Sequence, residues 1–244
     1  MIDEGLSQLI YGAVGGGLVA LIWKTVDTYV IGVRLGESVE ARKKLRAYAR
    51  PLWLECRELR FRMTQIRDKL EGDDPDGGLR ALQARPPDPH DVAWYTQDGY
   101  FATSTAYLIA AVAAWIRLYQ RDVVFLEFGA RSATHAFFKL TEDLQRTYSA
   151  RPSILWYYYF SAIGEMLVDR DVHAPLTMAQ FTLRLAEDER FRAFYAQLFE
   201  FVARMGRGDY LEVVGKVIQA ISDIGSFLQR HGLGAVAESA IDPT

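Results

Sequence analysis

Two pairs of arginine and histidine are the side chains in this sequence that could do acid–base or phosphodiester chemistry. Arg131 and His135 lie four residues apart near a predicted helix start, so both could lie on one helix face. Arg85 and His90 match the Arg-x4-His spacing of one class of helical ribonucleases, but prolines between and beside them exclude a helix there. Arg131 and His135 are therefore the better catalytic candidates, and a pair on the surface is the simpler interpretation.

Other common catalytic and metal-binding patterns are missing. Cys56 is the single cysteine, which excludes an intrachain disulfide, and it lies on an apolar helix stripe, so we expect a core thiol. The four histidines do not have zinc-ligand spacing, and Asp73, Asp74 and Asp76 lack the remaining ligands of a calcium loop. The sequence thus predicts no metal, no cofactor and no enzyme, and points to binding or assembly.

An uncharged run at the N-terminus is the element around which we expect the rest to be organised. Residues 5–23 contain no Asp, Glu, Lys or Arg. As a helix, these 19 residues would be about 28 Å long, close to the hydrocarbon thickness of a bilayer. A cleaved signal peptide is disfavoured because the chain starts with acidic Asp3 and Glu4. We therefore predict a transmembrane helix, with a buried core helix as the alternative.

Flanking charge predicts how this helix is oriented. Lys and Arg residues follow the run and none precedes it, so the positive-inside rule places the N-terminus outside the bacterial inner membrane and the body in the cytoplasm. Trp23 and Lys24 are expected at the membrane interface. Gly12, Gly16 and Ala20 recur at four-residue spacing and could let two such helices pack closely. Membrane lipid and a second copy of the chain are the predicted partners.

The segment after the anchor has the clearest helical periodicity. Residues 39–71 carry an apolar stripe that predicts a helix packed on the body or a coiled-coil seam, with a kink or restart at Pro51. Residues 72–92 are rich in Gly, Pro and Asp and predict a loop. Residues 93–128 predict one long helix, whose uncharged stretch 99–116 is either the buried central helix or a second membrane span.

The remainder of the chain also shows helical patterns and no convincing strand. The aromatic run 156–160 is expected mostly in the core, and residues 169–175 are expected to form a turn. Helices are predicted over residues 134–148, from Pro152 or Ser153 onward, and over residues 176–205 and 210–230. The fold class is therefore all-α: an N-terminal transmembrane helix followed by a helical-bundle cytoplasmic domain. The expected divisions are an anchor and juxtamembrane segment at 1–33, a body at 34–231 and a frayed tail at 232–244.

Two patches resemble a family of bacterial proteins with one N-terminal membrane helix and a helical cytoplasmic body. They are Tyr48–Leu52 followed by Leu59–Arg62, and Tyr100–Leu108 leading to Trp115 and Val124–Leu126. This resemblance implies an architecture, and no activity can be carried over from it because that family is uncharacterised. The layout is also similar to that of small membrane effectors of bacterial antiviral systems, some of which form pores.

Three function classes follow from these observations. The first is a membrane-anchored protein that acts by binding a protein partner or itself. The second is an oligomeric, pore-type effector in phage defence, and the third is a membrane-tethered nuclease or hydrolase built on Arg131 and His135. The net charge of −3 argues against a dedicated nucleic-acid binder, which usually has a basic excess.

Overall fold

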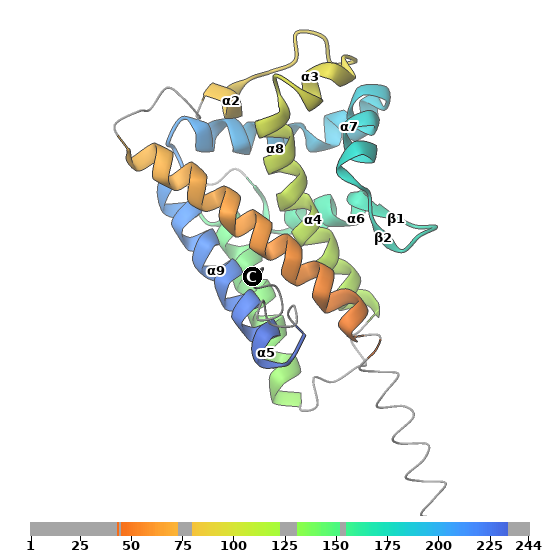
Figure 1. Cartoon of the computed structure of the whole chain (residues 1–244), viewed down its shortest axis with the longest axis vertical. Coiled ribbons are helices and arrows are strands. Elements are labelled where there is room, and N and C mark those ends of the chain that lie inside the picture. Colours follow the sequence, from red (N-terminus) through yellow and green to blue (C-terminus); the bar gives the residue numbers. More distant parts are fainter. Residues whose placement is uncertain (1–42, 44, 73–79, 123–130, 152–154, 234–244) are drawn as a thin grey trace, which may run out of the picture. The chain divides into compact units, whose positions relative to one another are not determined.

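Helices make up nearly all the regular structure in the computed structural model, which describes residues 43, 45–72, 80–122, 131–151 and 155–233. The all-α prediction is therefore confirmed (Figure 1). In chain order the elements are a helix over residues 45–71, α2 (Arg80–Gln83), α3 (Val92–Thr96), α4 (Tyr100–Asp122), α5 (Arg131–Ser149), α6 (Tyr157–Leu167), β1 (Val168–Asp169), β2 (Ala174–Pro175), α7 (Met178–Glu187), α8 (Glu189–Gly206) and α9 (Leu211–Arg230).

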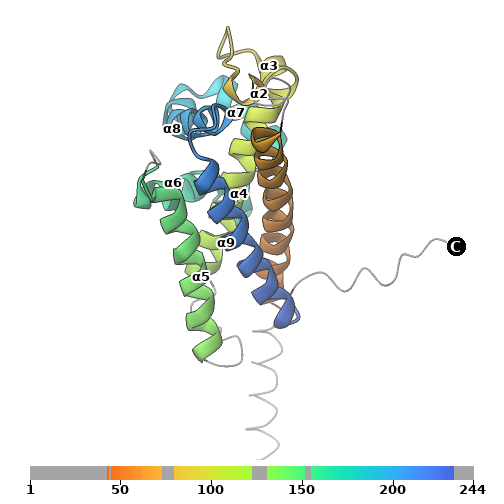
Figure 2. The same ribbon diagram turned by 90° about the vertical axis from the view of Figure 1, so that its left-hand side faces the viewer.

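The chain divides into two compact units, Met1–Lys44 and Leu45–Thr244, and we call the second unit the body. The predicted membrane helix 5–23 and the expected boundary at residue 33 lie outside the described residues, as does residue 234 onward. Within the body, the 45–71 helix, α4, α5 and α9 run beside one another, whereas α8 lies across one end of this bundle (Figures 1 and 2).

Helix α4 is the centre of the body. It contacts α6, α8, α7, α2 and α3, and its residues from Ile109 to Ala114 are almost completely buried. Among the described residues, Tyr100–Arg121 is the one helix long and apolar enough to cross a membrane, with a mean hydropathy of 1.4, yet 72% of its apolar 18-residue window is buried inside the body. The structure thus favours the buried central helix over a second membrane span for this segment.

The 45–71 helix carries the predicted stripe into the core. Leu52, Cys56, Leu59, Met63 and Ile66 on this stripe are all at most 1% exposed. The helix continues through the position of Pro51, so the expected restart does not occur there. A proline removes one helical hydrogen bond, and the fully buried residues beside it, Ala49 and Leu52, show that packing holds the helix together at this point.

The single long helix predicted over 93–128 is wrong, because α3 and α4 are separate helices. Between them, Gln97 has a non-helical backbone with φ −121° and ψ −91°. The indole of Trp94 folds over Gly99, where an added Cβ would lie 2.3 Å from the ring, so the turn requires glycine. The predicted loop 72–92 was also too long, since α2 lies inside it.

The helix predicted over 176–205 is likewise two helices, α7 and α8. Asp188 ends α7 with an extended backbone and starts α8, because its side chain accepts hydrogen bonds from the backbone N–H groups of Arg190 and Phe191 at 2.9 and 3.1 Å. Asp is a strongly preferred N-cap residue. Thr177 and Gln180 form a capping box at the other end of α7.

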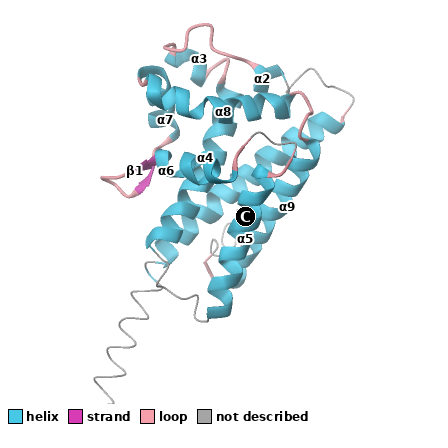
Figure 3. Cartoon of the chain, turned by 180° about the vertical axis from the view of Figure 1, so that it is seen from behind, coloured by secondary structure: helices cyan, strands magenta, loops and turns pink. Residues whose placement is uncertain are grey.

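The region around α6 differs most from the sequence-based expectation. Helix α6 begins after Trp156, later than Pro152 or Ser153, and Trp156 and Tyr158 are 76% and 82% exposed, so the aromatic run is not mostly core. Instead of a simple turn, β1 and β2 form a small antiparallel hairpin in which Val168 pairs with Pro175 (Figure 3). Helix α9 matches its prediction, and Gly232 with φ +66° follows its end.

Candidate functional site

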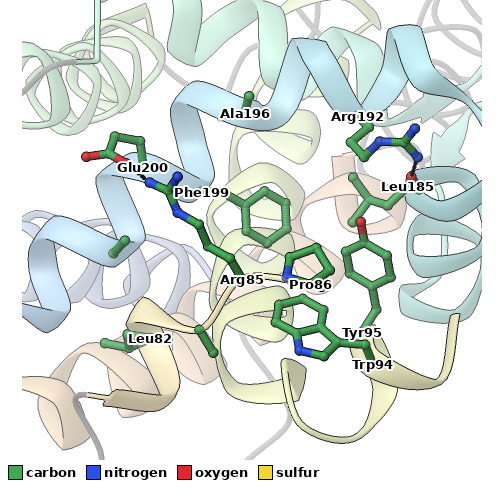
Figure 4. A pocket seen from close by; sticks show the side chains of 12 residues that line it. Leu82, Arg85, Pro86, Trp94, Tyr95, Leu185, Arg192, Ala196, Phe199 and Glu200 are labelled. Atoms are coloured by element: carbon green, nitrogen blue, oxygen red, sulfur yellow. Dashed lines mark hydrogen bonds and ion pairs between the residues drawn. The ribbon is translucent and has the colours of Figure 1, made fainter. Parts of the chain in front are cut away.

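A cleft of about 450 Å³ opens where α2 and α3 face α7 and α8, and it is our candidate functional site (Figure 4). Its volume lies in the range typical of ligand-binding pockets. Residues from four separate segments form its wall: Leu82, Ala84, Arg85, Pro86, Trp94, Tyr95, Leu185, Arg192, Ala196, Phe199, Glu200 and Ala203. The lining thus comes from α2 and the loop after it, from α3, from α7 and from α8.

The interior of the cleft is apolar and partly aromatic. Leu82, Trp94 and Tyr95 are buried and come from α2 and α3, and the half-buried ring of Phe199 comes from α8. Trp94 and Tyr95 pack edge to face with ring centroids 5.2 Å apart. Aromatic pairs of this geometry hold each other in place. Ala196 and Ala203 on α8 leave the remaining volume open because their side chains are small.

A network of charges forms one side of the cleft mouth. Arg85 donates a hydrogen bond to Glu200 across the mouth at 2.8 Å, and Arg85 is 76% exposed at its side chain. The same carboxylate accepts from Arg204 at 3.1 Å and Arg207 at 3.2 Å. These hydrogen bonds, above all the one from Arg204, lower the pKa of Glu200, which therefore stays ionised. The mouth thus carries more positive than negative charge.

The other side of the mouth is held by Arg192. One terminal nitrogen of its guanidinium donates to the backbone carbonyls of Leu185 at 2.6 Å, Ala186 at 3.1 Å and Pro89 at 3.3 Å. Two of these carbonyls belong to the last turn of α7, where they have no helical partner. Arg192 therefore caps α7 and ties the loop before α3 to it. Tyr95 supports the same loop by donating to the Pro89 carbonyl at 3.1 Å, and burial raises the pKa of Tyr95.

The lining offers apolar, aromatic and charged side chains for binding. They include no serine, cysteine, histidine or lysine. An apolar interior beside a net positive mouth suits an aromatic or aliphatic group with a neighbouring negative charge. Such a group could be a small molecule or a side chain of a partner protein.

The sequence-predicted catalytic candidates do not meet in this cleft. Arg131 and His135 lie in the first turns of α5, which contributes nothing to the cleft, and His135 is exposed. Arg85 contacts Glu200, whereas the Nδ1 of His90 bonds the Ala186 carbonyl at 2.9 Å, so this pair does not share a site. The described residues hold no group of three metal-ligating side chains.

Two further sets of predicted residues have different outcomes. Cys56 is buried, as predicted, and burial raises the pKa of its thiol, which disfavours the reactive thiolate. Gly12, Gly16, Ala20, Trp23 and Lys24 lie outside the described residues, so the oligomer and membrane interfaces stay predictions.

Sequence reasoning singled out one cleft residue, Arg85, as half of a weak catalytic pair with His90, and assigned no role to the others. Trp94, Phe199 and Glu200 were parts of helices with no assigned role, and Leu82 was in a predicted loop. One signal was present in the sequence: Arg192, Glu200, Arg204 and Arg207 supply charges to α8 and its end between apolar positions. That pattern is also typical of an ordinary solvated helix face, so it does not identify a cleft.

Comparison of the chain with protein-family models, curated proteins and solved structures gives no match. The resemblance to membrane-anchored bacterial proteins therefore stays a prediction.

Proposed function

We propose that this chain is a single-pass membrane-anchored protein without enzymatic activity, whose body binds a protein partner in the cleft between α2, α3 and α8. The observation that carries the proposal is the cleft itself, which is apolar inside and has Arg85 at its mouth. Anchoring rests on the uncharged run 5–23 and on the positive charge that follows it.

The expected occupant of the cleft is one apolar or aromatic side chain of a partner segment, with an acidic residue close to it in that segment. A buried aromatic anchor supplies much of the affinity in many protein interfaces. The acidic neighbour would meet Arg85, which is largely exposed and could reorient from Glu200, since Glu200 has two other arginine partners. Charge at the rim adds specificity more than affinity.

Membrane association is tested by fractionation of cells that express the full-length chain. We expect the chain to pellet with membranes, to resist alkaline carbonate and to be released by an uncharged detergent. A chain that stays in the supernatant as a monomer without detergent would overturn the anchoring proposal. In membranes, Gly16→Ile should weaken crosslinked oligomers because a large side chain separates the two helices.

The cleft is tested by placing a photo-crosslinking phenylalanine analogue at Ala196 or at Ala193. Both alanines are exposed on α8, but only Ala196 lines the cleft, so Ala193 is a matched control. We expect a discrete heterologous adduct from position 196 that is absent from position 193. In addition, Phe199→Ala should reduce the adduct, because the phenyl ring forms part of the apolar surface. The same adducts at both positions would contradict a specific cleft.

A further inference from the structure

A second hollow, of about 290 Å³, lies between the last turns of α4, helix α6 and the β1–β2 hairpin. Seven residues line it: Arg117, Leu118, Arg121, Glu165, Val168, Arg170 and His173. None of them lines the cleft of the preceding sections. This hollow is close to the lower size limit of small-molecule sites, so a compact ligand would suit it.

The charges that line the hollow are mainly positive. Three guanidinium groups face a single carboxylate, that of Glu165, and the imidazole of His173 lines the same hollow. Arg117 contacts Glu165 at 3.7 Å, and both side chains are about half exposed, so this ion pair is loose. Arg170 has no ion pair with any described residue, which leaves its guanidinium available for a ligand. The lining therefore holds three guanidinium groups against one carboxylate, and among them Arg170 is the one without an ion pair to a described residue.

The histidine of the hollow is held in an uncommon backbone conformation. His173 has a φ of +53° and is the one non-glycine with positive φ among the described residues. Arg121 donates to its Nδ1 at 3.1 Å. Because a guanidinium can only donate, Nδ1 must accept, and a neutral ring then carries its proton on Nε2. His173 thus offers one more donor to whatever occupies the hollow.

The hairpin positions Arg170 and His173 without using either side chain for its own turn. Asp169 supplies the turn contacts instead, since its carboxylate accepts from the N–H groups of Asp171 at 2.9 Å and Val172 at 3.4 Å. The pairing of Val168 with Pro175 then closes the hairpin beside α4. The two basic residues are therefore set opposite Arg117 and Arg121 by the fold.

We propose that this hollow binds a phosphate group. Arginine forks match the geometry of phosphate oxygens, and an ionised acceptor makes hydrogen bonds to guanidinium groups stronger than neutral ones. The phosphate could belong to a free phosphate ester or to an anionic lipid headgroup.

This site does not depend on the partner-binding cleft or on the membrane anchor. Titration of the full-length chain with inorganic phosphate, in an uncharged detergent at low ionic strength, tests it directly. The wild-type chain should bind phosphate saturably and lose affinity with added salt. The absence of saturable binding would overturn the proposal and leave the proposed function of the cleft untouched.

The decisive variant is Arg121→Gln combined with Arg170→Gln, with Arg67→Gln combined with Arg146→Gln as its matched control. Both doubles remove two guanidinium groups, and of these four residues only Arg67 is half-buried, but only the first pair lines the hollow. We expect the first double variant to weaken phosphate binding by about tenfold or more and the control by less than about twofold. Equal losses in the two would mean non-specific attraction and would overturn the site.

A variant that should strengthen phosphate binding is also needed, because weaker binding by the arginine variants could come from loss of folding. Glu165→Gln removes the one carboxylate of the lining while keeping its shape, so phosphate should bind about threefold more tightly. Unchanged or weaker binding by this variant would contradict the proposal. Both outcomes are read against thermal unfolding of each variant.

Two kinds of lipid nanodisc distinguish the sources of the phosphate. The full-length chain is inserted into discs of phosphatidylcholine with and without phosphatidic acid, and each is titrated with inorganic phosphate. If the lipid headgroup reaches the hollow, phosphatidic acid should block the titration. If the natural ligand is a soluble ester, the titration should be equal in both discs, and in either case the two arginine double variants should differ as above.

Discussion

Helix α4 packs against two neighbours in two different ways. Against α6 the contact is between backbones: a Cβ added to Gly164 would lie 2.5 Å from the carbonyl carbon of Ala113 and 2.7 Å from the nitrogen of Ala114. Against the 45–71 helix the contact is between side chains, including a T-shaped pair of Tyr48 and Trp115 at 6.4 Å. The first interface has no room for a methyl group at Gly164, whereas in the second a guanidinium of the 45–71 helix donates hydrogen bonds to α4.

The charged groups of the second interface are Arg62 and Glu55. The guanidinium of Arg62 donates to the Ser104 hydroxyl at 2.8 Å and to the Phe101 carbonyl and the Thr105 hydroxyl at 3.1 Å each. Glu55 is half-buried about two helical turns before Arg62 and has no hydrogen bond to any described residue. The contact of α4 with α6 depends on close approach of two backbones, which tolerates no larger residue at Gly164. The contact with the 45–71 helix depends on side chains, and substitution can weaken or strengthen it.

The largest expected effect on stability is at the contact between α4 and α6. Gly164→Ala should destabilise the body by about 3 kcal/mol, since backbone atoms cannot turn aside as a side chain can. Thermal and denaturant unfolding of the full-length chain, followed by circular dichroism, would measure this. A loss below about 1 kcal/mol would mean that α6 can move away from α4, contrary to the close approach of the two backbones.

Arg62→Met should have the next largest effect. Methionine keeps much of the apolar stem of the side chain but leaves Ser104 and Thr105 without their buried donor, so we expect a loss of about 2 kcal/mol. Arg60→Met is the matched control, because Arg60 is exposed on the same helix and should change the unfolding free energy by less than about 0.5 kcal/mol. Similar losses in both variants would show that the hydrogen bonds to α4 contribute little.

These two interfaces also mark what the sequence could and could not predict. The apolar stripe of residues 45–71 and the burial of α4 follow from periodicity and composition, which depend on the local sequence. The breaks at Gly99 and Asp188 were not predicted. At Gly99 the Trp94 ring occupies the place where a Cβ would lie, and at Asp188 a carboxylate caps α8. Continuous apolar periodicity across both positions predicted longer helices.

The cleft and the hollow beside the β1–β2 hairpin could not be predicted from the sequence, for a related reason. Leu82, Trp94 and Phe199 come from three helices, and Arg117 and His173 are separated by more than fifty residues. No spacing rule joins them, since only the tertiary fold brings them together. The sequence did identify residues with recognisable spacing, Arg131 and His135, but spacing along one helix says nothing about what lies opposite.

Glu55 makes the second interface sensitive to pH. Burial, together with the nearby charge of Glu58, raises the pKa of Glu55 from its ordinary value of 4.5 to about 7 in the folded chain. The folded state therefore holds more protons than the unfolded state between these values, so stability should fall as the pH rises from about 4.5 to about 7.

Glu55→Gln should remove that dependence. Allowing for solvent screening, we expect the variant to be more stable than wild type by about 1–2 kcal/mol at pH 8 and nearly equal to it at pH 4. Unfolding free energies at both pH values measure the difference. Glu71→Gln, at an exposed carboxylate near the end of the same helix, is the matched control. A wild-type profile that is flat from pH 4 to 8 would contradict this role of Glu55.

The smallest expected effect concerns a glycine that packing does not require. Gly225 lies in α9 beside a hollow of about 270 Å³ that the 45–71 helix also lines, and an added Cβ would meet nothing within 4 Å. Gly225→Ala should therefore stabilise the body by about 0.5–1 kcal/mol, because alanine favours the helix and no atom opposes it. Gly164→Ala should lower the free energy of unfolding, whereas Gly225→Ala should raise it. The two variants together therefore compare the α4–α6 contact with the more open contact between α9 and the 45–71 helix. If Gly225→Ala destabilises the body instead, the hollow beside α9 is filled by something that the described residues do not include.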